Sequence, residues 1–423
     1  RTAVGARLPG RGPQVRLLVW SQYFWPESFH INEVVRGLRE QGVELTVLTG
    51  KPNYPEGEIF AGYRAAGIQR EPHDGYEVVR VPLRARSKGS AKGLALNYLS
   101  FVLSGYLFAP FALRRQAFDL VFVYAPSPLI QTLPAIFVAW LKGAPLVLWV
   151  QDIWPDALQA TGFVTNRRVL RLVGRLMRTI DRHCDLILIQ SEGFRDAVER
   201  LVDDRSKVRF FPNSAAAMPA QPVVVGAAAA ICKRIEASFA VVFAGNIGTV
   251  QSCETIVEAA ALLREHASIR FFLVGSGSMA RAIADDIAAR GLDNIEMPGR
   301  VAGDEIPAIY AAASVLLLTF QPGSMLSATI PSKLQGYLAA GKPVIVSSDG
   351  EPANVLRSAA AGLVCQPGDP QALAEAVLRL AEMSAQERAV LGDNGRRYFM
   401  ANFHLPDRVA ELKGLFDNLA VRD

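Results

Sequence analysis

Two glycine-bearing turns in the second half of the chain have the residue types and spacing that suit phosphate binding. Segment 245–248 (GNIG) follows the apolar run FAVVF, and segment 275–277 (GSG) ends the next apolar run. A turn between a strand and a helix lets main-chain N–H groups approach a phosphate closely. One such turn is more often needed only for backbone geometry, but two on the same sheet edge favour an anionic ligand. Neither matches GxGxxG, which disfavours a nicotinamide oxidoreductase.

Lys333 stands at the start of a third informative segment, IPSKLQGYLAAGKPV. Pro331 can open a helix and Gly341 can end it, so Lys333 is expected on the first turn. Cations are normally biased away from helix N-termini because the helix dipole is positive there. A solvated lysine is possible, but a diphosphate held by Lys333 and the helix N-terminus explains its position more economically.

In the first half, Gln151 and Asp152 directly follow the apolar run LVLWV at 146–150. The carboxyl end of a parallel strand is where such sheets present ligand groups. Asp152 could orient a reacting group of a bound ligand, or it could cap the next helix, and the local sequence supports both interpretations equally. Asp156 is expected to be the cap or a first-turn acid of that helix.

The elements that must position these residues are legible as apolar runs of strand length separated by helical periodicity. This alternation of strand and helix patterns predicts an α/β protein with two doubly wound, Rossmann-like domains facing each other across a cleft. Helices are expected at 28–40 and 254–264, the second capped by Ser252. The expected strands are 16–20, 43–49, 76–82, 120–124, 146–150, 186–190, 208–213, 239–245, 269–275, 294–299, 314–320 and 343–348.

A length of 423 residues favours two domains. We expect an N-terminal Rossmann-like domain at 14–213 and a C-terminal Rossmann-like domain at 214–400. A C-terminal helix in 401–423 is expected to cross back to the first domain. Segment 219–230 has the Pro, Ala and Gly content of a linker.

Composition narrows the class further. The net charge of +5 has no dense basic block, which argues against nucleic acid and suits anionic lipid or phosphate ligands. Four scattered cysteines and five histidines offer neither a disulfide framework nor a zinc site, and a reducing compartment fits. Residues 1–13 have the composition of a loose leader. No DxD motif occurs, so no metal site is expected.

The order of the motifs FAGNIG, FLVGSG, PGRV and PSKLQGYLAAGKPVI resembles the donor domain of retaining GT-B glycosyltransferases of family 4. Within that family the chain is most similar to bacterial surface-polysaccharide transferases of the fucosaminyltransferase and colanic-acid type. Segments 22–32, 49–63 and 149–156 carry the subgroup match in the first half. The resemblance covers about residues 15–415.

This resemblance implies that domain 14–213 binds the acceptor and domain 214–400 binds the nucleotide-sugar donor. It also implies roles for individual residues. The nucleobase is expected near Arg300 and Val301, and the donor sugar near the loop before the helix that carries Lys333. The implied catalytic pair is Gln151 and Asp152. The implied donor-binding residues are Gly245, Asn246, Gly248, Gly275, Gly277, Arg300, Val301, Ser327, Ala328, Thr329, Ile330, Lys333 and Gln335, and the implied acceptor-side residues are Glu27, His30 and Asn53.

The chain also departs from the family pattern. The two glutamates that the family spaces eight residues apart fall on Ala328 and Gly336 here, so a ribose contact must come from Gln335 or from elsewhere. Asn246 replaces the usual arginine after the first glycine turn, and the usual lysine nearby is missing. Lys333 therefore carries more of the phosphate charge by itself.

The resemblance implies a retaining, metal-independent transferase without a cofactor. The expected donor is a UDP-sugar carrying an N-acetylated hexosamine or deoxyhexosamine, and the expected acceptor is a polyprenyl-diphosphate-linked saccharide of O-antigen or capsule synthesis. Such an enzyme is expected in the cytoplasm, peripheral on the inner face of the bacterial cytoplasmic membrane. Two alternatives are a UDP-sugar 2-epimerase and an inactive nucleotide-sugar-binding subunit.

Segment 94–113 is uncharged over twenty positions and is flanked by Lys88, Lys92, Arg114 and Arg115. It is long enough to span a bilayer, but the strand at 120–124 must rejoin a sheet begun before the segment. A buried core helix and a helix lying in the lipid interface are the remaining alternatives. We favour the interfacial helix, with aromatic residues such as Phe101 and Phe108 exposed.

Overall fold

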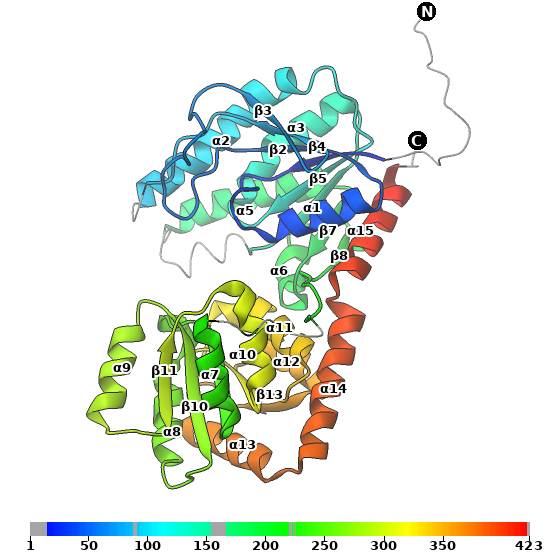
Figure 1. Cartoon of the computed structure of the whole chain (residues 1–423). Helices are drawn as coiled ribbons and strands as arrows, with labels where there is room; N and C mark the ends of the chain where they lie inside the picture. Colours follow the sequence, from blue (N-terminus) through cyan, green and yellow to red (C-terminus); the bar gives the residue numbers. More distant parts are fainter. Residues whose placement is uncertain are drawn as a thin grey trace, which may run out of the picture. The chain divides into compact units, whose positions relative to one another are not determined.

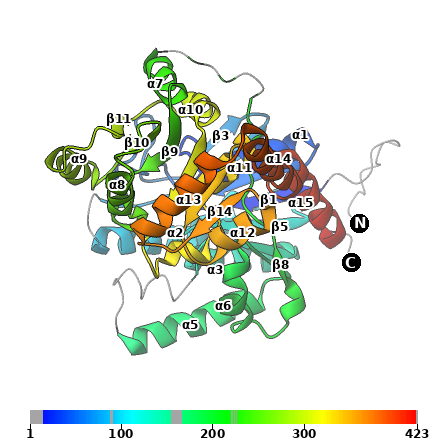
Figure 2. The same ribbon diagram turned by 90° about the horizontal axis from the view of Figure 1, so that it is seen from below.

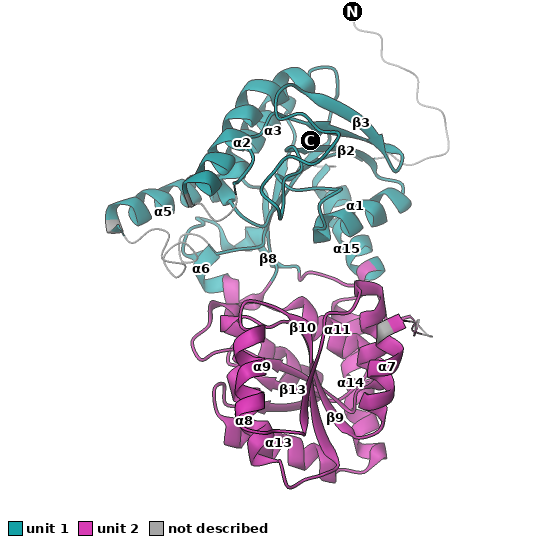
Figure 3. Ribbon diagram, turned by 60° about the vertical axis from the view of Figure 1, so that its left-hand side comes forward, with its two compact units in different colours: residues 1–190, 195–211, 406–423 teal, residues 191–194, 212–405 magenta. Residues whose placement is uncertain are grey.

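The computed structural model describes residues 15–87, 91–153, 166–219, 222, 224 and 226–420. The chain divides into two compact units, shown in two colours in Figure 3. Unit 1 comprises the described parts of 1–190, 195–211 and 406–423, and unit 2 comprises 191–194 and the described parts of 212–405. The end of the chain therefore belongs to the same unit as its first half.

Unit 1 is built on an eight-stranded sheet of order β3-β4-β2-β1-β5-β6-β7-β8. Neighbouring strands are parallel except for β3 and β4, which form an antiparallel pair at the edge. The sequence analysis missed β3, because its sequence QREPH contains no apolar run. The strands are β1 Arg16–Trp20, β2 Glu44–Thr49, β3 Gln69–His73, β4 Tyr76–Arg80, β5 Leu120–Ala125, β6 Leu146–Val150, β7 Leu186–Ile189 and β8 Val208–Phe210.

Helices cover both faces of this sheet (Figures 1 and 3). Helices α2 and α3 pack together, and α5 contacts α3. On the other face, α15 lies against α1, where Val409 touches Gly37, and its Phe416 ring is 5.1 Å from that of Phe122. The helices are α1 His30–Glu40, α2 Ala91–Ala112, α3 Thr132–Lys142, α5 Arg167–Arg182, α6 Arg195–Glu199 and α15 Leu405–Ala420.

Unit 2 has a six-stranded parallel sheet of order β11-β10-β9-β12-β13-β14. All the strands predicted for the second half are present, and β14 is an additional short edge strand. Its four residues form a run too short to stand out in the sequence. The strands are β9 Phe239–Asn246, β10 Ile269–Ser276, β11 Ile295–Gly299, β12 Val315–Thr319, β13 Val344–Ser347 and β14 Gly362–Cys365.

The helices of unit 2 also form two layers, which Figure 2 shows from below. Helix α8 packs on α13, while α7 packs on α10 and α11 packs on α14. The predicted linker at 219–230 is wrong in its second half, because α7 begins at Gly226; the alanine run there is a good helix former. The helices are α7 Gly226–Glu236, α8 Cys253–Leu262, α9 Ala280–Ala289, α10 Ile306–Ala312, α11 Ser332–Ala340, α12 Glu351–Ala359, α13 Pro370–Glu382 and α14 Ala385–Asn402.

Candidate functional site

The two glycine turns of unit 2 touch each other at the carboxyl ends of β9 and β10. Gly245 pairs with Gly275 in the parallel register of these strands. A Cβ atom at Gly275 would lie 1.9 Å from the carbonyl oxygen of Gly245, and one at Gly277 would lie 2.2 Å from that of Ile247. Both distances are shorter than any real contact, and the φ angles of Gly245 and Gly275 are 140° and 148°. Only glycine therefore allows the two turns to approach so closely.

The side chain of Lys333 reaches the first of these turns from helix α11. A Cβ atom at Gly245 would lie 2.3 Å from the Nζ atom of Lys333, and this Nζ is 4.3 Å from the ring centroid of Phe243. Within the described residues the Nζ atom is buried and has no hydrogen-bond partner. Burial lowers the pKa of Lys333 to about 8, because desolvation penalises the ammonium form. An anion bound at the glycine turns would supply the negative counter-charge that this ammonium lacks.

Polar side chains complete the first turn. The side-chain Nδ2 of Asn246 donates to the Oε1 of Gln251 at 3.2 Å, and a Cβ atom at Gly248 would lie 2.6 Å from the same Nδ2. Ser252 stands at the predicted N-cap position of α8, with a φ of 48°, but its side chain makes no capping hydrogen bond. Its hydroxyl instead lies 2.9 Å from that of Thr255.

The loop before α11 is held by its neighbours in unit 2. The hydroxyl of Ser191 donates to the carbonyl oxygen of Ala328 at 2.6 Å. The main chain of Ser327 is packed against Gly350, where a Cβ atom would lie 2.2 Å from the carbonyl oxygen of Ser327. The other predicted donor residues differ in exposure. Thr329 is half-buried, Ile330 and Val301 are buried, and Arg300 is exposed.

Gln335 has a structural partner. Its side chain is buried, and its Nε2 donates to the carbonyl oxygen of Asn213 at 2.6 Å. This bond uses one of the two N–H donors of the amide, so it does not decide the predicted ribose contact, which stays a prediction. At Gly336, where the family has a glutamate, a Cβ atom would lie 3.2 Å from the ring of Tyr310.

In unit 1, Glu27 and Asn53 form a buried network that holds the loop after β2. One carboxylate oxygen of Glu27 accepts the main-chain N–H groups of Asn53 at 2.8 Å and Tyr54 at 2.7 Å. The side-chain Oδ1 of Asn53 accepts from the Nδ2 of Asn97 on α2 at 3.3 Å. Burial raises the pKa of Glu27 to about 7, although these N–H groups oppose the shift. Both side chains are thus committed to the fold, and their predicted contact with an acceptor stays a prediction.

His30 and Asp152 lie on different elements of unit 1. His30 is the first residue of α1, its ring is 5.6 Å from that of Trp149, and burial lowers its pKa to about 4. The imidazole is therefore neutral near pH 7. Asp152 follows β6 and accepts the N–H of Ile153 at 3.1 Å.

Burial also raises the pKa of Asp152 to about 6, against the opposing effects of that bond and of a hydrogen bond to Ser127. The preceding Gln151 extends the β5–β6 pairing, since its N–H donates to the carbonyl oxygen of Ala125 at 3.2 Å. The predicted helix cap Asp156 lies outside the described residues, as does Lys88.

One prediction about α2 is wrong. Phe101 is 0% exposed and its ring packs at 6.1 Å, edge to face, on that of Trp20, so it belongs to the core. Phe108 is only half-buried. Spacing alone did not reveal which face of this almost uniformly apolar helix turns inward.

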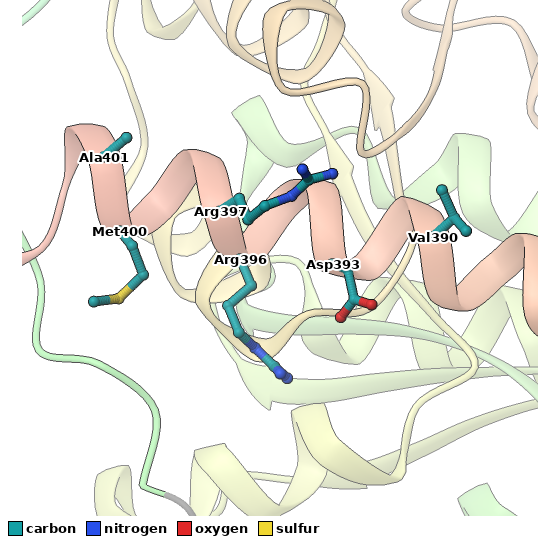
Figure 4. A pocket seen from close by; sticks show the side chains of 6 residues that line it. All are labelled: Val390, Asp393, Arg396, Arg397, Met400 and Ala401. Carbon is teal, nitrogen blue, oxygen red and sulfur yellow. The ribbon is translucent and has the colours of Figure 1, made fainter.

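A cavity of about 760 Å³ runs along α14 and is lined by none of the predicted donor residues (Figure 4). Arg396, which helps to line it, donates to the carbonyl oxygen of Ala340 at the end of α11, at 3.4 Å. No group of three or more His, Cys, Asp or Glu side chains that could hold a metal occurs among the residues that the structure describes.

Comparison with known proteins covers both units. Residues 28–214 match the model of a glycosyl transferase 4-like domain, and residues 238–383 match that of glycosyl transferases group 1. The putative colanic acid biosynthesis glycosyl transferase WcaI of Escherichia coli is 27% identical over 79% of this chain and 84% of its own length. The probable glycosyltransferase WbjE of Pseudomonas aeruginosa is 25% identical over 76% of this chain and 81% of its own.

Solved structures show the same fold. Anabaena HepE in complex with UDP superposes with a TM-score of 0.69 at 14% identity, covering 96% of this chain and all of that one. WaaG, a glycosyltransferase involved in lipopolysaccharide biosynthesis, gives a TM-score of 0.61 at 15% identity, covering 93% of this chain and 99% of that one. At such identities the likeness concerns the fold alone, which is the two-domain GT-B fold.

Proposed function

This chain belongs to glycosyltransferase family 4, and from that premise we propose that it moves a sugar from a UDP-sugar to a lipid-linked saccharide during surface-polysaccharide synthesis. The transferred sugar is an N-acetylated hexosamine or deoxyhexosamine, the anomeric configuration is retained, and no divalent metal is needed. The enzyme works at the cytoplasmic face of the membrane that holds its acceptor.

The observation that carries the proposal is the buried, unpartnered ammonium of Lys333 beside the paired glycine turns. A diphosphate placed there receives main-chain N–H groups, the N-terminus of α11 and one ammonium charge. These groups stabilise the negative charge that develops as UDP leaves, which is the task that a divalent ion performs in metal-dependent transferases. The acceptor hydroxyl attacks from the face that UDP leaves, and its proton passes to the departing phosphate oxygen.

The names of the relatives support the substrate class. WcaI is named for colanic acid biosynthesis, and HepE was crystallised with UDP and with UDP and glucose. The name of WcaI fits a polymeric product, and the ligands of HepE fit a nucleotide-sugar donor. Asp152, at the carboxyl end of β6 with a raised pKa, is the residue we assign to orienting a reacting hydroxyl.

The purified chain should be assayed against a panel of UDP- and GDP-sugars, scoring nucleotide release with and without a polyprenyl-diphosphate-linked acceptor. We expect release from one UDP-sugar to depend on acceptor. Excess EDTA should change turnover by less than about twofold, under ~0.5 kcal/mol of barrier. Conversion of the donor alone into an epimer, or activity abolished by EDTA and restored by Mg²⁺, would contradict the proposal.

A further inference from the structure

Helix α2 is apolar on nearly every side, and one of its apolar sides faces outward from unit 1. Its polar residues Asn97 and Ser104 are buried against the unit, while one outward row spaced by four residues is apolar. In that row Leu103, Leu107 and Phe111 are 59%, 62% and 60% exposed. A row of exposed leucine and phenylalanine side chains is suited to a surrounding less polar than water.

The apolar surface continues from α2 onto α3. The ring of Tyr106 lies 5.8 Å from that of Phe137, which stacks at 6.1 Å on Trp140. Trp140 is 74% exposed, and the neighbouring Leu141 is exposed as well. Aromatic rings of this kind are typical of the boundary between the hydrocarbon and head-group layers.

The adjoining helix α5 adds positive charge. Near its N-terminus the exposed Val169 and Leu172 are flanked by the exposed Arg168, Arg171 and Arg175. No carboxylate in the described parts of the chain forms an ion pair with these three arginines. Helix α5 contacts α3, which in turn packs on α2.

We propose that the outward faces of α2, α3 and α5 together form the docking surface for a bilayer rich in anionic lipid. The leucines and aromatic rings enter the head-group boundary, and the arginines of α5, with Lys92, Arg114 and Arg115 at the ends of α2, contact lipid phosphates.

Two alternatives to this docking surface, a membrane-spanning α2 and a dimer interface, fit less well. Helix α2 is long and apolar enough to cross a membrane, but it connects β4 to β5, which belong to one sheet, so both its ends lie on the same side. A second copy of the chain, bound through the same surface by a two-fold axis, would bring the α5 arginines of both copies together without acids to compensate them. An anionic membrane satisfies both the apolar area and the charge.

This inference deepens the proposed function, because a lipid-linked acceptor requires the enzyme to work at a membrane. It can be tested apart from catalysis by flotation of the full chain with phosphatidylcholine vesicles, with and without phosphatidylglycerol. Arg171→Gln combined with Arg175→Gln should weaken binding to anionic vesicles about 30-fold at low salt, and should not affect neutral vesicles. The double change Leu103→Ser and Leu107→Ser should weaken binding to both.

Matched controls use equally exposed residues of unit 2. Val390→Ser on α14 and Arg281→Gln on α9 should leave vesicle binding unchanged. Every variant should keep the wild-type affinity for UDP by calorimetry, so that a failure of donor binding is separated from a failure of docking. Surface variants that bind vesicles as wild type does would overturn the proposal. So would a self-association, measured by sedimentation, that the leucine pair abolishes in a chain that never binds vesicles.

Discussion

If the ammonium of Lys333 holds the donor diphosphate, UDP affinity must fall as this group loses its proton. The pKa of Lys333 in the free protein is lowered to about 8 by burial, so at pH 7 the group is mostly charged and at pH 9 mostly neutral. The phosphate groups of UDP complete their ionisation near ~6, below this window. Between pH 7 and the alkaline range in which the uracil ring itself loses a proton, the pH dependence therefore reports on the protein, and Lys333→Met shows any contribution of the ligand.

The size of the effect follows from the shifted pKa. Because only the charged form binds tightly, the apparent Kd rises by a factor of one plus the ratio of neutral to charged lysine. One pH unit above the pKa this is roughly tenfold, or about 1.4 kcal/mol. The sign is fixed: affinity is fully present below about pH 7 and is lost as pH rises through 8.

Calorimetric titration of UDP between pH 7 and pH 9 measures this directly. Lys333→Met keeps an apolar stem over Phe243 but removes the charge, so it should weaken UDP binding roughly tenfold to a hundredfold at pH 7 and abolish the pH dependence. Lys342 lies just beyond the other end of α11, and burial lowers its pKa too, so Lys342→Met is the matched control. A flat pH profile in the wild-type protein, or one that survives in Lys333→Met, would refute the assignment.

Three further changes test the site and the fold. Gly275→Ala should abolish UDP binding because its Cβ would meet the carbonyl oxygen of Gly245. Gly291 is also at positive φ but has open space around it, so Gly291→Ala should reduce only the stability, and equal UDP affinities of the two variants would contradict the assignment. Asp152→Asn should cut turnover strongly without lowering Tm at pH 7, since a buried carboxylate with a raised pKa destabilises the fold once ionised; an active variant that melts several degrees lower would make Asp152 a structural cap. Phe101→Ala should reduce the free energy of unfolding by about 3–5 kcal/mol, and Leu103→Ala, two residues away but exposed, by under ~0.5 kcal/mol; denaturant titration that finds equal losses would show the helix face to be misassigned.

Local patterns in the sequence determined most of the sheet and the place of the donor turns. The buried parallel strands read as continuous apolar runs, because both their faces are covered by helices. Gly341 was predicted to end α11, and it is the C-cap of this helix in the left-handed conformation with a φ of 66°. This geometry can be predicted from the residue type alone, because it favours glycine. The edge strand β3 gave no such signal, since its residues alternate between half-buried and exposed.

Only the tertiary structure decided what each side chain meets. Lys333 was expected on a first helical turn, but its contact with Gly245 joins two segments far apart in the sequence. Glu27 and Asn53 looked free for a ligand, and the fold engages both in holding a loop. The outward row of α2 could not be read from a helix that is apolar on every side. Burial and hydrogen bonding depend on residues that the fold brings together from distant parts of the chain. The local sequence pattern around one residue contains no information about these partners.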